Sequence, residues 1–335
     1  MDWDLIGHQW VVKVLKRHIA QKDIRQAYLF TGPPGVGRRT LAIRMAQALN
    51  CSHPPHPGGI CGICSNCTQI EHITHPDLVV VQSEQVGGVL KVDQIRDLQH
   101  YLSLAPYQAS YRVAILLRFE EANASAANAL LKTLEEPAPK VVLVLTAETS
   151  EQLLPTIVSR CELLRLSPLP LASVRTGLMD RWGLLSEEAD LLAHLSGGRP
   201  GYAFRLHQEP NRLDLRRQWL DDHIRLLSAD RVTRFAFAEK LSHDKEALLE
   251  VLHIWLSFWR DILLQAANTN TMITNVDRMV EIKQLTQSLD LDTAHRMVAN
   301  LRSASNLINS NANTRLVTEV LMLKLPHIQL VPSKG

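Results

Sequence analysis

The chain has 335 residues and a mass of 37.7 kDa, which is more than one compact core usually organises. Hydrophobic residues make up 46% and charged residues 21% of the chain, so a mainly disordered or fibrous protein is excluded. The 36 Lys and Arg residues against 34 Asp and Glu give a formal charge of +2, which argues against wholesale coating of nucleic acid.

The sequence also bears on the cellular compartment. No apolar run reaches the roughly 18 residues that a membrane span needs. The N-terminal segment MDWDLIGHQW carries acidic residues and lacks the basic and apolar regions of a secretory signal. A cytoplasmic protein of two or three domains, without a membrane partner, is therefore predicted.

Short apolar runs alternate with helical patterns over the first half of the chain. The predicted strands are residues 27–31, 78–81, 113–117, 141–145 and 162–166. Runs that are apolar on both faces and separated by helices indicate a parallel sheet covered on each side. Residues 1–167 are therefore predicted to form an α/β domain with a five-stranded parallel sheet.

The strand signal stops after Pro170. Residues 171–207 show the pattern of two or three short helices, and the pattern is purely helical from about Leu213 onward. We expect a small helical domain over residues 168–207 and a larger helical domain over residues 208–335.

Three local features are predicted within the larger helical domain. Trp255 and Trp259 share a helix face and are expected in the core or at a subunit contact rather than as a platform for base stacking. The polar stretch 268–275 predicts a loop. Asn313 or Thr314 is the expected cap of the last helix.

A glycine-rich segment follows the first predicted strand and opens the next helix, the context in which backbone amides hold phosphates. Its key residues are Gly32, Gly35, Gly37, Arg38, Arg39 and Thr40. The working motif needs Lys and then Ser or Thr after the last glycine, whereas this chain has two arginines. The planar guanidinium of Arg38 is a poor substitute for a compact ammonium. Arg39 removes the hydroxyl for Mg²⁺ and adds an opposing charge. ATP hydrolysis is not expected here, while passive binding of ADP or phosphate stays open.

Four of the five cysteines fall close together in the sequence: Cys51, Cys61, Cys64 and Cys67. In a reducing compartment such a cluster more often holds a metal than forms disulfides. Four thiolates suit tetrahedral Zn²⁺ and leave no open position for catalysis, so we predict a structural zinc site in an insertion at 51–67. A ligand role for His53 or His56, or an iron–sulfur cluster, stays open from the residues alone.

A longer string of residues carries a family resemblance. Residues 126–137 (AANALLKTLEEP), together with 159–161 (SRC), 75–77 (HPD) and the four-cysteine insertion, resemble the bacterial clamp-loader subunits of the AAA+ class. Within that class the pattern is most similar to the delta-prime family of DNA polymerase III, which is related to gamma/tau. The resemblance covers nearly all of the chain and weakens between about 205 and 300. It implies an AAA+ P-loop domain, a helical lid domain and a C-terminal helical collar that oligomerises, and it supports zinc as the metal.

The same resemblance implies a degenerate ATP site. Counting back from Asn128 places the acidic Walker B pair of the family on Leu117 and Arg118. The sensor-one position is retained as Thr146, and the sensor-two arginine of ATP-hydrolysing relatives falls on Gly201. These changes agree with the altered glycine-rich loop, and they distinguish the chain from the gamma/tau subunits. No enzyme activity of the isolated chain is expected.

Arg160 in the SRC motif is retained. In clamp loaders this arginine reaches the γ-phosphate of ATP in a neighbouring subunit, and an arginine supplied in trans stabilises transition-state charge. The resemblance thus implies a non-hydrolysing subunit that works with gamma/tau and delta to load the sliding clamp on primer-template DNA. Lys132, Glu135 and Glu136 are interpreted as a helix surface that packs or pairs at an interface.

Two alternatives stay open. The first is an ATP-hydrolysing gamma/tau-like subunit that tolerates Arg38. The second is a stand-alone zinc protein unrelated to replication.

Overall fold

The protein is described here by a computed structural model, which covers residues 3–269, 271–310 and 312–328. It divides into two compact units, Met1–Leu184 with Gly198–Tyr202, and Leu185–Gly197 with Ala203–Gly335. The predicted domain boundaries at 167 and 207 stay a prediction. The last residues of the predicted C-terminal domain, 329–335, lie outside the described residues.

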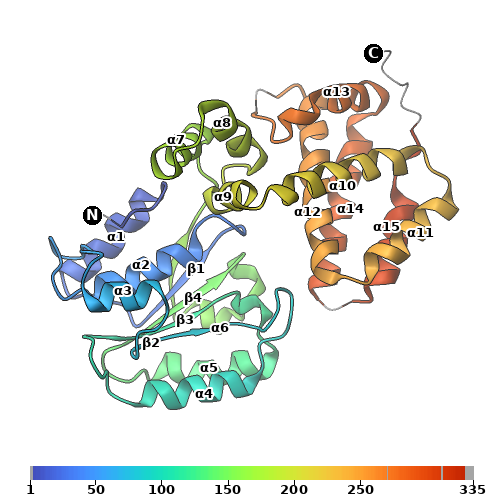
Figure 1. Cartoon of the computed structure of the whole chain (residues 1–335). Helices are drawn as coiled ribbons and strands as arrows, with labels where there is room; N and C mark the ends of the chain where they lie inside the picture. The colour runs from blue at the N-terminus through green and yellow to red at the C-terminus, as the bar shows by residue number, and fades with distance from the viewer. Residues whose placement is uncertain (1–2, 270, 311, 329–335) are drawn as a thin grey trace. The chain divides into compact units, whose positions relative to one another are not determined.

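The first unit is built on a five-stranded parallel sheet with the strand order β2-β3-β4-β1-β5 (Figure 1). The strands are β1 (Ala27–Thr31), β2 (Leu78–Val81), β3 (Arg112–Leu116), β4 (Val141–Ala147) and β5 (Glu162–Arg165). Each lies within two residues of its predicted bounds, so the predicted sheet is confirmed. β1, β3 and β4 are buried along their whole length, as expected of strands covered on both faces.

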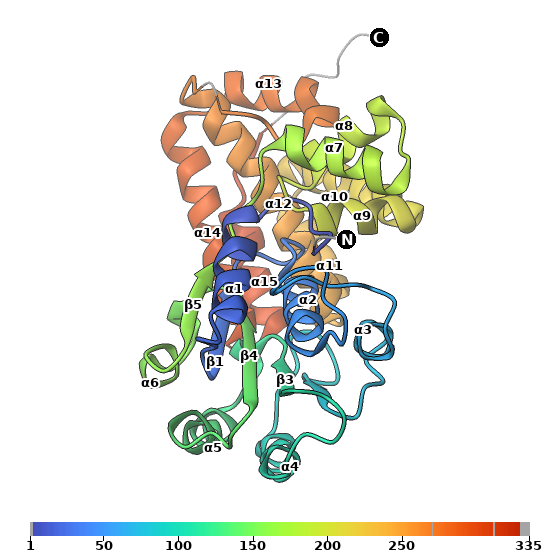
Figure 2. The ribbon, with the colours of Figure 1, turned by 90° about the vertical axis from the view of Figure 1, so that its left-hand side faces the viewer.

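Helices cover both faces of this sheet. One face carries α1 (Gln9–Ala20), α2 (Arg38–Asn50) and α3 (Ser65–Glu71); the other carries α4 (Val92–Ser103), α5 (Ala124–Glu135) and α6 (Pro155–Val158) (Figures 1 and 2). Successive side chains of a strand point to opposite faces. Tyr28 and Phe30 of β1 accordingly pack into the first core, while Ala27 and Leu29 pack into the second.

The remaining helices complete the two units. Short 3₁₀ turns lie at η1 (Phe119–Glu121) and η2 (Ser150–Gln152), and α7 (Leu171–Trp182) follows β5 in the first unit. α9 (Pro200–Gln208) begins in the first unit and continues in the second. In the second unit, the regular elements among the described residues are all helical: α8 (Ser186–Leu195), α10 (Pro210–Ser228), α11 (Arg231–Ser242), α12 (Lys245–Ala266), η3 (Val276–Arg278), α13 (Met279–Ser288), α14 (Leu291–Asn309) and α15 (Thr314–Lys324).

The core of the second unit is centred on α12. Trp255 and Trp259 are completely buried there, which confirms their predicted place in a core. The indole Nε1 of Trp259 donates a hydrogen bond to Nε2 of His223 at 2.6 Å. The side chain of Asn313 caps α15 by accepting from the backbone N–H of Leu316 at 3.0 Å. None of the described helices is both long enough and apolar enough to cross a lipid bilayer.

Candidate functional site: a phosphate loop, four cysteines and an exposed arginine

The glycine-rich loop joins the carboxyl end of β1 to the start of α2. Gly32, Gly35 and Gly37 have φ values of 148°, 82° and 116°, a region that side chains other than glycine's rarely enter. Gly37 is the N-cap of α2, so the first amides of the helix open toward the loop. The backbone therefore keeps the form of a phosphate-binding loop.

Other parts of the first unit bond to this loop from two directions. The backbone N–H of Gly201 donates to the carbonyl of Gly35 at 2.8 Å. Nε2 of His8 donates to the carbonyl of Val36 at 3.0 Å, and burial lowers the pKa of His8, which keeps its ring neutral. A Cβ atom placed on Gly201 would lie 3.0 Å from the carbonyl oxygen of Gly35. The position expected for the sensor-two arginine thus packs directly on the loop backbone.

Arg38 is surrounded by carboxylates of its own unit. Burial lowers the pKa of Arg38, while the charges of Glu120 and Glu148 oppose that shift. Burial raises the pKa of Glu120 to about 7, with Glu148 and Glu121 adding to the effect. Among the described residues, Nη1 of Arg38 and Oε2 of Glu120 are buried without a hydrogen bond. Arg38 thus lies buried near two acidic side chains of its own unit, Glu120 and Glu148.

The expected Walker B positions, Leu117 and Arg118, hold no acid, and Arg118 forms an ion pair with Glu121. Nε of Arg118 lies 3.0 Å from each carboxylate oxygen of Glu121. Glu121 also accepts a hydrogen bond from the backbone N–H of Gly87 at 2.7 Å. The hydroxyl of Thr146, the sensor-one position, accepts from the backbone N–H of Arg118 at 3.0 Å. This ion pair was not predicted from the sequence, although the i, i+3 spacing of the two opposite charges is a usable signal.

The structure brings the four cysteines together. Their sulfur atoms all lie within 4.8 Å of one another, and the sulfurs of Cys61 and Cys67 are 3.9 Å apart. Tetrahedral zinc with bonds of about 2.3 Å requires sulfur separations of about 3.8 Å. The backbone N–H groups of Cys61 and Cys64 each donate to a cluster sulfur at 3.4 Å, which suits thiolate ligands. The donor set therefore fits a closed, tetrahedral structural site and needs no histidine.

Side chains of α2, the helix that follows the glycine-rich loop, bond to the segment that carries the cysteine cluster. Nε2 of Gln47, which is almost completely buried, donates to the carbonyl of Cys67 at 2.8 Å and to Glu71 at 3.0 Å. Arg44 forms an ion pair with the same Glu71 carboxylate. The cysteine cluster and the glycine-rich loop are thus both connected to α2, a link that was not predicted from the sequence.

Arg160 lies between α6 and β5, with its side chain 35% exposed. Its Nη1 donates to the carbonyl of Thr156 at 2.9 Å, and its Nη2 lies 2.7 Å from Oε1 of Glu135. Glu135 is itself 51% exposed, so the pair contributes at most about 1 kcal/mol. An anion from outside the chain can therefore replace Glu135 at low cost.

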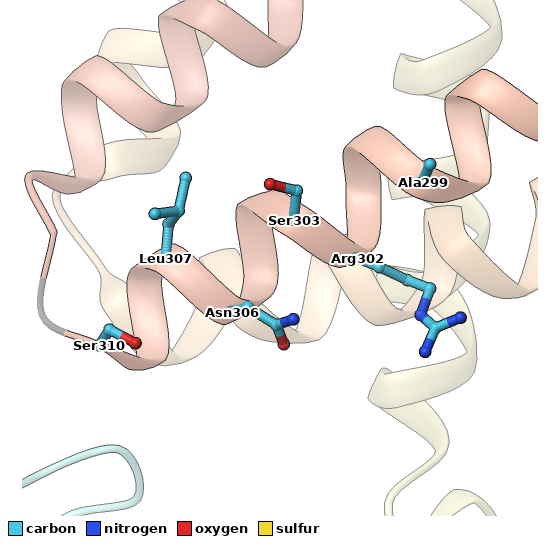
Figure 3. A pocket seen from close by; sticks show the side chains of 6 residues that line it. All are labelled: Ala299, Arg302, Ser303, Asn306, Leu307 and Ser310. Carbon is cyan, nitrogen blue, oxygen red and sulfur yellow. The ribbon is translucent and has the colours of Figure 1, made fainter. Parts of the chain in front are cut away.

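A surface hollow of about 460 Å³ lies elsewhere, in the second unit. Its lining side chains all come from α14 and the residue that caps it: Ala299, Arg302, Ser303, Asn306, Leu307 and Ser310 (Figure 3). The hollow is thus one face of a single helix, and its lining contains no acid, histidine or cysteine. It contains none of the usual metal-ligating side chains.

Comparison with known proteins identifies the family. The family described as DNA polymerase III, delta subunit, matches residues 7–170, and the family described as DNA polymerase III, delta subunit, C terminal, matches residues 210–327. The DNA polymerase III subunit delta' of Bacillus subtilis is 30% identical over 328 residues, which cover 94% of this chain and 95% of that subunit. The chain belongs to the delta-prime family of DNA polymerase III subunits.

Two shorter matches add detail to the delta-prime assignment. The subunit delta' of Pseudomonas aeruginosa is 39% identical over 184 residues, 54% of this chain and 55% of that subunit. The subunit tau of Bacillus subtilis is 33% identical over 159 residues, 48% of this chain and 28% of tau. The chain thus matches only about half of the first relative and a quarter of the second. Similarity to a delta-prime subunit reaches both units of the fold, which confirms the predicted AAA+ clamp-loader architecture.

Proposed function

We propose that this delta-prime family member is a cytoplasmic clamp-loader subunit that does not hydrolyse ATP and that presents Arg160 to ATP bound by a neighbouring gamma/tau subunit. Together with a delta subunit, the assembly loads the sliding clamp on primer-template DNA. Cys51, Cys61, Cys64 and Cys67 hold a structural Zn²⁺ ion. The helical C-terminal part serves as the collar that joins the subunits.

The ion pair between Arg118 and Glu121 is the main observation that supports the proposed lack of ATP hydrolysis. Hydrolysis in P-loop proteins needs an acid at the end of the third strand to hold Mg²⁺ and a second group to orient water. Here the strand end presents a cation, and Glu121 is already bonded to Arg118 and to Gly87. Positions 38 and 201 also argue against hydrolysis. Arg38 replaces the compact lysine of the working motif, and Gly201 replaces the sensor-two arginine, so the two cationic groups that would bind the phosphates are both changed. Bound ADP or phosphate without turnover remains compatible with the retained loop amides.

The exposure of Arg160 supports its role in trans. Among the described residues, a carbonyl and an exposed carboxylate are the partners of this guanidinium, which can therefore turn toward a phosphate of an adjoining chain. In well-studied nucleotide hydrolases, an arginine supplied by a second chain accelerates cleavage by roughly 10³- to 10⁵-fold. A chain that has lost its own catalytic groups therefore still contributes to the chemistry of its neighbour.

Turnover by the isolated chain tests the first half of the proposal. We expect purified protein with Mg-ATP to show no hydrolysis above the buffer background, while a gamma/tau subunit assayed alongside is active. Turnover comparable to gamma/tau, and abolished by Arg38→Ala, would instead establish the ATP-hydrolysing alternative.

Reconstitution of the loader tests the second half. Clamp- and DNA-stimulated ATP turnover is measured with wild-type chain, with Arg160→Ala and with Arg96→Ala. Arg96 is a matched control, since it is an exposed arginine of the same unit that pairs with an exposed acid, Asp93. We expect a large drop only for Arg160→Ala, with the complex still assembled in gel filtration. Equal turnover for all three proteins would remove the trans arginine from the proposal.

A further inference from the structure

The outer face of α1 carries a stripe of exposed side chains with an aromatic residue among cations. Trp10, Lys13 and Arg17 follow one another at i, i+3 and i+7, so they lie along one side of the helix. Trp10 is 52% exposed, and Lys13 and Arg17 are exposed as well. The opposite side of the helix is buried in the core through Val11, Val12 and Leu15.

Within the described part of the chain, no acidic side chain pairs with the two cations of this stripe, Lys13 and Arg17. α1 contains Lys13, Lys16 and Arg17 and no acidic residue, and Lys22 follows just after the helix ends. The side chains of Lys13, Arg17 and Lys22 form no ion pair with any residue that the structure describes. Other exposed arginines of the first unit do pair with an acid, for example Arg96 with Asp93 and Arg25 with Asp23.

The helix that carries this stripe, α1, is held in place by the cysteine-bearing insertion. A Cβ atom on Gly58, in the cysteine-bearing insertion, would lie 3.0 Å from Cα of Lys16, so the insertion packs directly against α1. Nε1 of the buried Trp3 donates to the carbonyl of Gly58 at 2.8 Å and holds this contact in place. A helix fixed in this way loses little backbone freedom when its outer side chains bind a partner.

We propose that the outer face of α1, with Trp10, Lys13 and Arg17, binds single-stranded DNA. The cations contact successive phosphates, and the indole of Trp10 provides a surface on which one base stacks. Proteins that bind single strands without sequence preference combine these two elements, a basic track for the backbone and an aromatic side chain for the bases.

An acidic protein is the alternative to DNA as a partner for the positive charge of this face of α1. An exposed tryptophan placed between cations favours the nucleic acid, because stacking on a flat ring is available to every base and to few acidic side chains. This inference concerns a surface separate from the glycine-rich loop and from Arg160. It therefore stands or fails independently of the proposed role in ATP turnover.

Binding of the full chain to a fluorescein-labelled oligo(dT), followed by fluorescence anisotropy over a range of salt concentrations, tests the proposal. We expect saturable binding at low salt, and the logarithm of the association constant should fall against log[salt] with a slope of about −1.4, as for the two phosphate contacts of Lys13 and Arg17. The double variant Lys13→Glu/Arg17→Glu is expected to weaken binding at least tenfold and to reduce the slope by about 1.4. Trp10→Ala is expected to weaken it roughly five- to a hundredfold, and Trp10→Phe much less.

Lys240→Glu/Lys283→Glu is the matched control, since it makes the same change in net charge at two exposed lysines of the second unit. It should bind the oligonucleotide like wild type. If Lys13→Glu/Arg17→Glu melts at a lower temperature than wild type, the neutral variant Lys13→Gln/Arg17→Gln is used in its place. The proposal is overturned if wild type does not bind, if the control weakens binding as much as the α1 variant, or if the α1 variants bind DNA normally and instead lose a protein partner.

Discussion

Oε1 of Glu135 lies 2.7 Å from Nη2 of Arg160, and this ion pair joins the last residue of α5 to the turn that follows α6. The two residues come from the two most diagnostic motifs of the sequence, the AANALLKTLEEP string and the SRC tripeptide. Glu135 was interpreted from the sequence as a helix-end residue that packs or pairs at an interface. In the isolated chain it pairs with Arg160 itself.

Glu135→Gln is expected to leave turnover of the reconstituted loader unchanged or to raise it by no more than about fivefold. An exposed ion pair contributes up to about 1 kcal/mol, and this is the free energy that Arg160 loses when it turns to a phosphate. Glu136→Gln is the control, because Glu136 is the exposed neighbour in the same motif. A loss of turnover as large as that of Arg160→Ala would show that Glu135 is itself required in the assembled site.

Removal of the metal is expected to destabilise the chain. Purified protein should contain one zinc per chain by elemental analysis, and Cys61→Ser should lose it and melt several degrees lower, because the free energy of metal binding contributes directly to folding. Cys161→Ser is the control, since Cys161 lies outside the cluster. A metal-free protein with an unchanged melting temperature would contradict the zinc assignment.

Glu120 predicts a pH dependence of stability. Its pKa is raised to about 7 in the fold, against about 4.3 in an unfolded chain. A carboxyl group with a raised folded pKa stabilises the fold below the unfolded pKa, and that contribution is lost as the pH rises toward 7. Glu120→Gln removes this loss, so its unfolding free energy relative to wild type should increase between pH 5 and pH 8 by about 1 to 3 kcal/mol in urea titrations.

The control for this experiment is Glu121→Gln. It breaks the ion pair with Arg118 and is expected to lower stability at both pH values rather than to raise it at high pH. A constant difference between Glu120→Gln and wild type from pH 5 to pH 8 would show that Glu120 is not held in its neutral form.

Arg234 predicts a large effect on stability in the second unit. Its buried guanidinium donates to five backbone carbonyls near the ends of α10 and α15, those of Leu226, Leu227, Met322, Leu325 and Pro326. Lysine has three donors on one atom and cannot reach all five. Arg234→Lys should therefore lower the free energy of unfolding by about 3 kcal/mol, whereas Arg231→Lys, at an exposed position, should change it by less than about 0.5 kcal/mol. Equal effects would show that the five carbonyls do not depend on the guanidinium.

Much of the fold followed from local patterns. The five strands were predicted because their apolar runs are short, continuous and separated by helical periodicity, and β1 lies at the predicted residues 27–31. Trp255 and Trp259 were predicted in a core from their spacing alone. Some strand ends differ from the prediction by one or two residues. In β4, for example, pairing with β1 continues to Ala147, two residues beyond the end of the apolar run.

The partners of the site residues were not predictable in the same way. Arg38 could be recognised as a departure from the phosphate-binding motif, but its position among Glu120 and Glu148 depends on segments about 80 and 110 residues away. Likewise, nothing in the sequence around Gly201 shows that its amide bonds to Gly35. The link from Gln47 to Cys67 depends on how α2 and α3 pack.

The sequence by itself determined which chemical groups the chain possesses: four thiols at metal-binding spacing, a glycine-rich loop without its lysine, and an arginine in a recognisable motif. Helix and strand periodicity determined the elements that carry them, since side-chain burial repeats with the backbone geometry. Only the tertiary structure decided which partners these groups and their neighbours contact. Glu121 is bonded to Arg118, Gly201 packs on the loop and Arg160 stays exposed beside Glu135. Gly201 and Arg160 each meet a partner from a distant segment of the chain, whereas Arg118 and Glu121 are only three residues apart. In each case the distance between the groups and their burial in the fold, rather than the residue types alone, set the interaction energy.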